Sequence, residues 1–219
     1  MKFKGSFVTS ASGSIAGITA SRNRGGQYIR ARLIPTDPAA ALQMVVRGIF
    51  GAVTARWLAD LSEAERDAWD LYASNTPMID ALGDTIFLSG HQQFVRTNVA
   101  ALQAGQTQFD VAPTVYGTGQ LAELGTPAAT GATVSVAITS MPANSTAILF
   151  AGRPQNASVS HFRGPWRFVD VSATSPVAGT QPFPVAPGNR QWVGVRLLND
   201  DGRLSGLVLG GPVIQTIAV

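Results

Sequence analysis

The chain has 219 residues, of which 45% are hydrophobic and 13% charged, and a formal net charge of +3. This length suits one large domain or two small ones, and the ordinary apolar content predicts a buried core. The absence of cysteine excludes disulfides, thiolate zinc sites and cysteine nucleophiles, and only two histidines argue against a histidine metal cluster. No apolar run approaches the roughly 20 residues of a membrane span, and the N-terminus lacks the apolar core of a signal peptide. We therefore expect a soluble protein that is not secreted by that route and does not enter a membrane.

The charges are few and unevenly distributed. A low charge content suits a chain that hides its surface against neighbours, and equally a β-rich domain full of Ser, Thr and Gly, and both interpretations stay open. Residues 1–56 carry eight basic side chains and one acid, whereas residues 57–110 carry eight acids and two arginines. A basic head followed by an acidic middle predicts electrostatic contacts with partners.

Residues 1–34 are predicted to be an extended basic arm with a β-hairpin. The arm is rich in Gly, Ser and Ala and has too few large apolar residues to bury a core of its own. A strand over Ile15–Ser21, a glycine turn at Asn23–Gly26 and a strand over Gln27–Leu33 give the hairpin. Because an isolated two-stranded ribbon is marginal in water, we expect the arm to be held against something else.

The arm also holds the candidate partner contacts, which are Arg22, Arg24, Tyr28, Arg30 and Arg32. Strand alternation places Arg30 and Arg32 on one face, and the apolar residues of the same run on the other. Those apolar residues are Ile29, Ala31 and Leu33. Three interpretations stay open: docking onto the acidic helical region of this or an adjacent subunit, binding of a phosphate backbone with Tyr28 stacking on bases, or a plain solvated face.

Residues 35–105 are predicted to form a small domain of three helices. Asp37 can cap the first helix, with Pro38 at its first helical position. This helix carries one apolar stripe at helical spacing. The stripe consists of Leu42, Val45, Val46, Ile49, Val53 and Trp57.

Two capping boxes mark the later helices of this region. Ser62 with Glu65, and Ser89 with Gln92, have the S-x-x-E/Q spacing in which side chains satisfy the free N–H groups of a helix start. Gly105 is placed to end the third helix. Three aromatic residues are expected in the core between these helices, and they are Trp57, Trp69 and Tyr72.

Residues 106–116 are predicted to be a linker, and residues 117–219 an antiparallel β-sandwich of the immunoglobulin or fibronectin type III kind. Short β-rich runs follow one another here, separated by Gly, Pro, Asn and Ser. The predicted strands are a weak run at Gln120–Leu124, then Ala132–Thr139, Ala147–Gly152, Trp166–Val171, Gln191–Leu198, Leu204–Leu209 and Val213–Ala218. The tryptophan strand followed by a D-G-R-x-S turn is similar to fibronectin type III-like modules.

No motif in the sequence indicates a reaction. The string G-x-G-x-x-A at residues 117–122 precedes a β-only region, whereas a dinucleotide site needs it between a strand and a helix. No Walker A loop, H-E-x-x-H or G-x-S-x-G motif is present, and the paired acids of the second helix are expected to be solvated. We expect no catalytic, cofactor-binding or metal-binding residues and no enzymatic activity.

Three sequence words occur in order: G-S-I-A-G-I-T-A-S-R-N-R-G-G-Q-Y-I-R-A-R, P-T-D-P-A-A-A-L-Q-x-x-x-R and W-L-A-D-L-S-E-A-E-R-D-A-W-D-L-Y-A, in a likeness that covers residues 11–105. This combination resembles proteins encoded among the virion genes of tailed bacteriophages and prophages. The resemblance implies a structural virion subunit, on the head, neck or tail, that is made in the bacterial host cytoplasm. Its partners would be other virion proteins and copies of itself, in a homo-oligomeric assembly formed through the arm and the helical region.

Two further functions stay open at this point. The first is a nucleic-acid-binding protein that uses the basic arm, whose affinity would fall steeply with salt. The second is a receptor- or carbohydrate-binding module that uses the sandwich. That module would need an exposed aromatic platform, for which the candidates are Trp166, Phe183 and Trp192.

Overall fold

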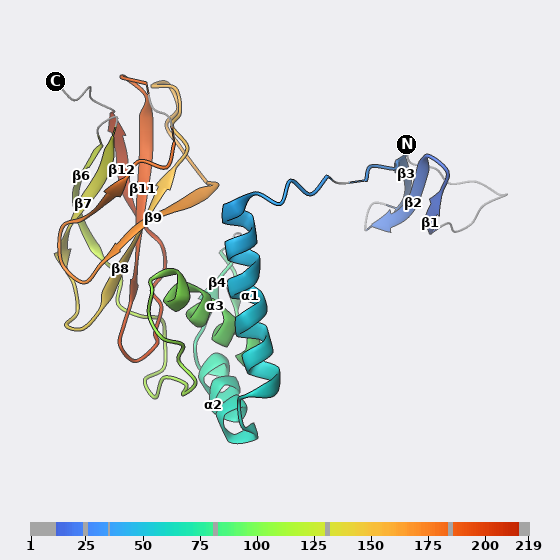
Figure 1. The fold of residues 1–219 in the computed structure, drawn as a ribbon, viewed down its shortest axis with the longest axis horizontal. Helices are drawn as coiled ribbons and strands as arrows, with labels where there is room; N and C mark the ends of the chain where they lie inside the picture. The colour runs from blue at the N-terminus through green and yellow to red at the C-terminus, as the bar shows by residue number, and fades with distance from the viewer. Residues whose placement is uncertain are drawn as a thin grey trace. The chain divides into compact units, whose positions relative to one another are not determined.

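The computed structural model describes residues 12–23, 26–34, 36–80, 83–129, 132–183 and 186–214. The chain divides into two compact units, Met1–Met44 and Val45–Val219. Within the described residues there are three helices and several antiparallel sheets, and the C-terminal part is rich in strands (Figure 1). The predicted α+β class is therefore confirmed.

The first unit contains a three-stranded antiparallel sheet in the order β1-β2-β3. Its strands are β1 (Gly13–Ile15), β2 (Ile18–Asn23) and β3 (Gly26–Ala31). The predicted hairpin corresponds to β2 and β3 and is confirmed, whereas β1 was not predicted. A tight turn between β1 and β2, with Ala16 at a φ of 52°, adds this short edge strand.

Helix α1 (Ala41–Ala59) begins later than the sequence suggested. The predicted start at Pro38 is wrong because Ala39 has a φ of 45°, which interrupts helical backbone. Asp37 instead accepts a hydrogen bond from the Ala39 N–H (3.2 Å), which closes a local turn ahead of the helix.

Both predicted capping boxes are present at the starts of α2 (Glu63–Ser74) and α3 (Gly90–Gln103). Ser62 accepts from the Glu65 N–H while the Glu65 carboxylate accepts from the Ser62 N–H, and Ser89 with Gln92 repeats this arrangement. Between the two helices lies a minimal hairpin of β4 (Met78–Ile79) and β5 (Thr85–Ile86). The core of these helices is aromatic, and the predicted core residues Trp69 and Tyr72 are buried there while Trp57 packs at its margin.

The remaining strands form two antiparallel sheets. One has the order β10-β7-β6, with β6 (Glu123–Ala129), β7 (Thr133–Ser140) and β10 (Val177–Thr180). The other has the order β12-β11-β8-β9, with β8 (Thr146–Gly152), β9 (Trp166–Ser172), β11 (Arg190–Leu198) and β12 (Val208–Ile214). Alternate residues of both sheets share one buried cluster, as in Val134 and Val136 of β7 and Leu149 and Val195 of β8 and β11.

Two of the strand predictions were wrong in detail. The runs Leu204–Leu209 and Val213–Ala218 were expected as separate strands, but a single strand, β12, spans Val208–Ile214, and residues 215–219 lie outside the described part. Leu204 makes only an isolated bridge with Leu198. Strand β10 was missed because it has only four residues, VAGT, one of them a glycine, which is too short for an alternating pattern to stand out.

Helix α3 and the β-rich region share a core within the second unit. Thr97 donates to the Gly202 carbonyl (3.1 Å), and Arg96 donates to the carbonyls of Leu204 and Ser205 (both 3.1 Å). Small residues of α3 pack beside these bonds against apolar residues of the strands. This cluster consists of Ala100, Ala101, Ala104, Ile148, Leu198 and Leu204. The helices are thus anchored on the loop that joins β11 to β12.

Candidate assembly surfaces

The arm sheet brings two of the predicted contact residues onto one face. Tyr28 and Arg30 lie two residues apart on β3, opposite Ser21 and Thr19 of β2. Arg22 lies on β2 opposite Gln27, and Arg32 follows the end of β3, where its N–H donates to the Gly17 carbonyl (2.8 Å). Arg24 lies outside the described residues.

The two faces of the arm sheet differ in polarity. The face of Tyr28 and Arg30 also carries Ser14 and Thr19, whose hydroxyls are hydrogen-bonded at 2.8 Å. The opposite face, set by the register, carries only apolar side chains at its centre. These are Ile15, Ile18, Ala20, Ile29 and Ala31. Ile15 and Ile18 are exposed to solvent, so this small sheet has an apolar face and a basic polar face.

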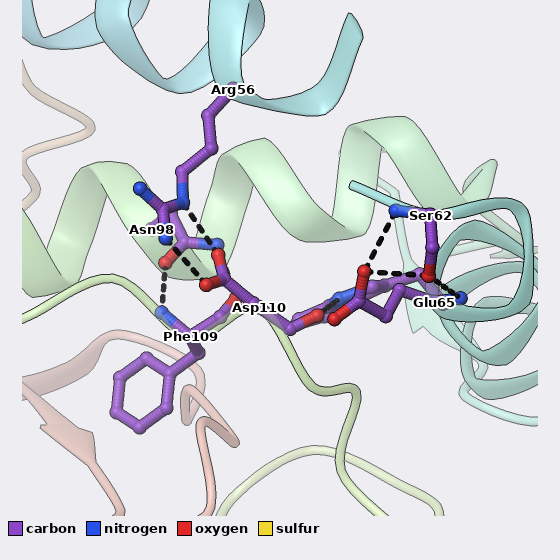
Figure 2. A network of polar contacts seen from close by, with 7 residues as sticks. Arg56, Ser62, Glu65, Asn98, Phe109 and Asp110 are labelled. Carbon is purple, nitrogen blue, oxygen red and sulfur yellow. Dashed lines mark hydrogen bonds and ion pairs between the residues drawn. The ribbon is translucent and has the colours of Figure 1, made fainter. Parts of the chain in front are cut away.

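Helix α1 is anchored through its C-terminal half. Val53 is fully buried in the aromatic core, with Ile49 and Trp57 packed at its margin. Arg56 forms a two-pronged ion pair with Asp110, in which Nε lies 2.6 Å from Oδ1 and Nη2 approaches Oδ2 (Figure 2). These contacts fix the last three turns of α1 to the rest of the second unit.

The apolar stripe of α1 continues toward its N-terminus beyond the core that it serves. Val45, Val46 and Phe50 precede Val53 by three to eight residues, a spacing that keeps them on the same side of the helix. Yet they are 57%, 47% and 52% exposed. We call these three residues the α1 stripe. The sequence predicted Val45 and Val46 as part of an apolar stripe but did not include Phe50. It gave no sign that these residues are uncovered, because periodicity reports a face and not what covers it.

Helix α2 carries the opposite kind of surface. Glu63 and Asp67 are exposed and four residues apart, which places them on the same side of α2, and Asp60, in the turn just before the helix, is exposed as well. None of the three carboxylates has a side-chain hydrogen bond or an ion pair within the described residues, although Asp60, after Asp110, lies near enough to Arg56 to raise the pKa of that guanidinium. We call them the acidic ridge, and the sequence had indicated only that such acids would be solvated.

The segment 106–116, predicted as a linker, contains no helix or strand and is bound by all three helices. Asn98 of α3 is buried and pairs with the Phe109 backbone in both directions, at 2.6 and 3.1 Å (Figure 2). Trp69 of α2 donates to the Asp110 carbonyl (2.8 Å), next to the ion pair from Arg56 of α1. The segment therefore acts as a fixed strut of the second unit.

The ion pair in this strut makes stability depend on pH. Hydrogen bonding from Arg56 lowers the pKa of Asp110, and hydrogen bonds from Ser62 lower the pKa of Glu65. A carboxyl group whose pKa is lower in the folded than in the unfolded chain stabilises the fold above its unfolded pKa, and that contribution disappears as pH falls through the folded pKa. We expect the free energy of unfolding to fall below about pH 5.

Asp110→Asn tests the origin of that dependence. Because the pair is about one-third exposed, the substitution should cost about 1 kcal/mol or less at neutral pH. It should also make the free energy of unfolding fall less as the pH is lowered, which urea unfolding at several pH values measures. Asp200→Asn, at an exposed turn position, is the matched control and should leave the pH profile unchanged. An unaltered profile for Asp110→Asn would show that the ion pair contributes nothing to it.

The structure also shows where the glycine string lies and whether the described residues include metal-binding groups or membrane-spanning helices. The glycine string 117–122 is irregular backbone leading into β6, and the Gly117 N–H and carbonyl are bound by Thr76 (3.1 Å) and Tyr72 (2.9 Å). In the part of the chain that the structure describes, no group of His, Cys, Asp and Glu side chains is placed to hold a metal ion. No helix among those same residues is long and apolar enough to cross a membrane.

The aromatic platform needed for a carbohydrate-binding sandwich is not assembled. Trp192 is buried and stacks on Phe162 at 5.6 Å, and Trp166 meets the same ring edge-on. The central guanidinium carbon of Arg167 lies over the Phe183 ring, 4.6 Å from the centre of that ring. The three candidate rings therefore pack against neighbours of their own.

Comparison with models of protein families and with curated proteins finds no match. What the chain does is therefore inferred from its own surfaces.

Proposed function

We propose that this protein is a structural subunit of a tailed-phage virion that assembles through its N-terminal arm and helical region. The observation that carries the proposal is the α1 stripe, a row of large apolar side chains that continues a buried stripe into solvent. Contiguous exposed apolar surface on an otherwise ordered fold is typical of protein interfaces. The apolar face of the arm sheet supports the same conclusion, since Ile15 and Ile18 are exposed there and covering apolar surface is favourable.

The energetics favour association over exposure. Burying a side chain such as Val or Phe completely contributes about 1.5–3 kcal/mol, so covering the half-exposed α1 stripe recovers part of that amount for each residue. The anchored half of α1 keeps the stripe in a fixed orientation, which reduces the entropy lost on binding. A rigid apolar helix face is thus a suitable contact for a subunit that is used repeatedly.

Within this proposal the β-rich region is a fibronectin type III-like sandwich. Two features support this finer assignment. The described residues of this region form seven strands, and in the sheet orders β10-β7-β6 and β12-β11-β8-β9 the sequence neighbours β9 and β10 belong to different sheets. Such Greek-key connections are typical of this group of sandwiches. The sandwich would then reinforce the assembly or project from it.

Substitution of the α1 stripe tests the proposal. We expect the double variant Val46→Glu with Phe50→Glu to lose self-association, measured as mass by light scattering after gel filtration, because two carboxylates cannot be buried in an apolar contact. Both positions are exposed in the single chain, so its unfolding midpoint should change little.

The matched control is Ala55→Glu, which adds an acid at an exposed position on the opposite side of the same helix. It should assemble like the unmodified protein. If the stripe variant assembles as well as the control does, the α1 stripe is not an assembly surface and the proposal loses its main support.

A further inference from the structure

We infer that the basic arm of one copy binds the acidic ridge of α2 in a second copy. This inference rests on the proposed function, because it names the partner of the arm within the assembly. It follows from charge complementarity between two surfaces of the same chain, whose described charged side chains form no ion pair.

The arm supplies positive charge without any acid. Residues 1–34 contain two lysines, four arginines and no Asp or Glu. Arg30 and Arg32 are exposed, and neither has an ion pair among the described residues. Tyr28 lies beside Arg30 on the same face of the sheet, with the polar residues Ser21 and Thr19 opposite them on β2. A face of this composition suits a carboxylate-rich surface.

The acidic ridge supplies negative charge that its own helix does not neutralise. Glu65, the acid between the ridge residues, is used by the capping box, and Asp70 accepts from the Gly90 N–H (2.8 Å). Arg66, the basic residue of α2, directs its guanidinium to the Leu61 carbonyl at 2.7 Å. Glu63 and Asp67 are thus like charges four residues apart, an arrangement that destabilises a helix until a cation approaches.

A second copy satisfies both surfaces at once. Each copy carries one basic arm and one acidic ridge, so every copy can give an arm and receive one, and repeated contacts of this kind build a ring or a lattice. Exposed ion pairs of this type set partner choice and register more than affinity, and they weaken as salt screens them. The apolar α1 stripe would provide the affinity, and the arm and ridge the specificity.

Charge-reversal variants of the full-length protein test the inference. One variant carries Arg30→Glu and Arg32→Glu, and the other carries Glu63→Lys and Asp67→Lys. The dissociation constant for self-association of each variant alone should rise by about tenfold or more, because like charges then face each other. The two variants mixed in equal amounts should regain the mass of the unmodified assembly, since a reversed arm then meets a reversed ridge.

A control variant, Glu123→Lys with Asp200→Lys, makes the same charge change at exposed positions of the β-rich region and should assemble normally. The neutral variants Arg30→Gln with Arg32→Gln, and Glu63→Gln with Asp67→Gln, replace any reversed variant that fails to fold. Each should weaken association, and mixing them should restore it only in part, because only the unmodified arm of one variant and the unmodified ridge of the other can still pair.

The outcomes separate this inference from the proposed function. If the unmodified protein assembles and both reversed variants assemble equally well, or if mixing restores nothing, the arm does not bind the ridge although the assembly stands. If the arm variant loses binding to a DNA duplex while the ridge variant assembles normally, the arm's partner is nucleic acid and the inference is overturned. If no form of the protein self-associates, the proposed function itself fails.

Discussion

Replacing Trp69 by alanine is expected to lower the free energy of unfolding by about 3–5 kcal/mol, which is the usual cost of removing a large buried aromatic side chain. Trp69 is completely buried and meets the rings of Tyr72 and Phe94 edge-on, at 5.9 and 5.4 Å between ring centres. Its indole N–H also binds the Asp110 carbonyl and so joins the strut to α2. The substitution therefore leaves a cavity and an unpaired carbonyl together.

Urea unfolding monitored by circular dichroism measures this loss. Trp69→Phe separates the two effects, because it keeps most of the packing and removes the hydrogen bond, and it should cost clearly less than the alanine variant. A cost below about 1 kcal/mol for Trp69→Ala would show that the aromatic core does not hold the helices, since surface substitutions alone have effects of that size.

Gly90→Ala is expected to destabilise the protein by about 1–3 kcal/mol or more, as overpacking of a close contact does. A Cβ atom at this position would lie 2.4 Å from Asp70 Oδ1, 2.6 Å from the Asp70 nitrogen and 2.8 Å from the Trp69 carbonyl carbon. Two of these three atoms belong to backbone, so α2 and α3 must separate to admit the methyl group. The hydrogen bond from the Gly90 N–H to Asp70 is then strained as well.

Gly51→Ala is the matched control in a helix. Nothing lies within 4 Å of a Cβ at that position, so the substitution should stabilise α1 by about 0.5–1 kcal/mol through helix propensity. Thermal unfolding of the two variants should shift in opposite directions. Equal shifts of the two unfolding midpoints would mean that α2 and α3 are not in close contact at Gly90 in solution.

The features that the sequence predicted well are local ones. The capping boxes at Ser62 and Ser89 depend on residues three apart, and both start helices as expected. The hairpin of the arm depends on alternation and a glycine turn, and it too is present. The start of α1 was misplaced because Pro38 and Asp37 fit a helix start and a turn equally well, and only the backbone at Ala39 decides between them.

Long-range features could not be predicted in the same way. The binding of Arg96 and Thr97 to the β11–β12 loop joins residues about a hundred positions apart, and no periodicity reports such a contact. The exposure of Val46 and Phe50 is of the same kind, since an apolar stripe looks alike whether it meets its own chain or another copy. The uncovered face of α1, which carries the functional proposal, therefore became visible only in three dimensions.

Amide hydrogen exchange of the unmodified protein, measured over α1 at low and at high protein concentration, tests the proposed assembly most directly. If the α1 stripe is an interface between copies, protection around residues 45–50 should rise with concentration while that around Val53 stays high throughout, because Val53 is buried within a single chain. Protection that does not depend on concentration, with the protein associating through other residues or not at all, would contradict the assembly role of α1.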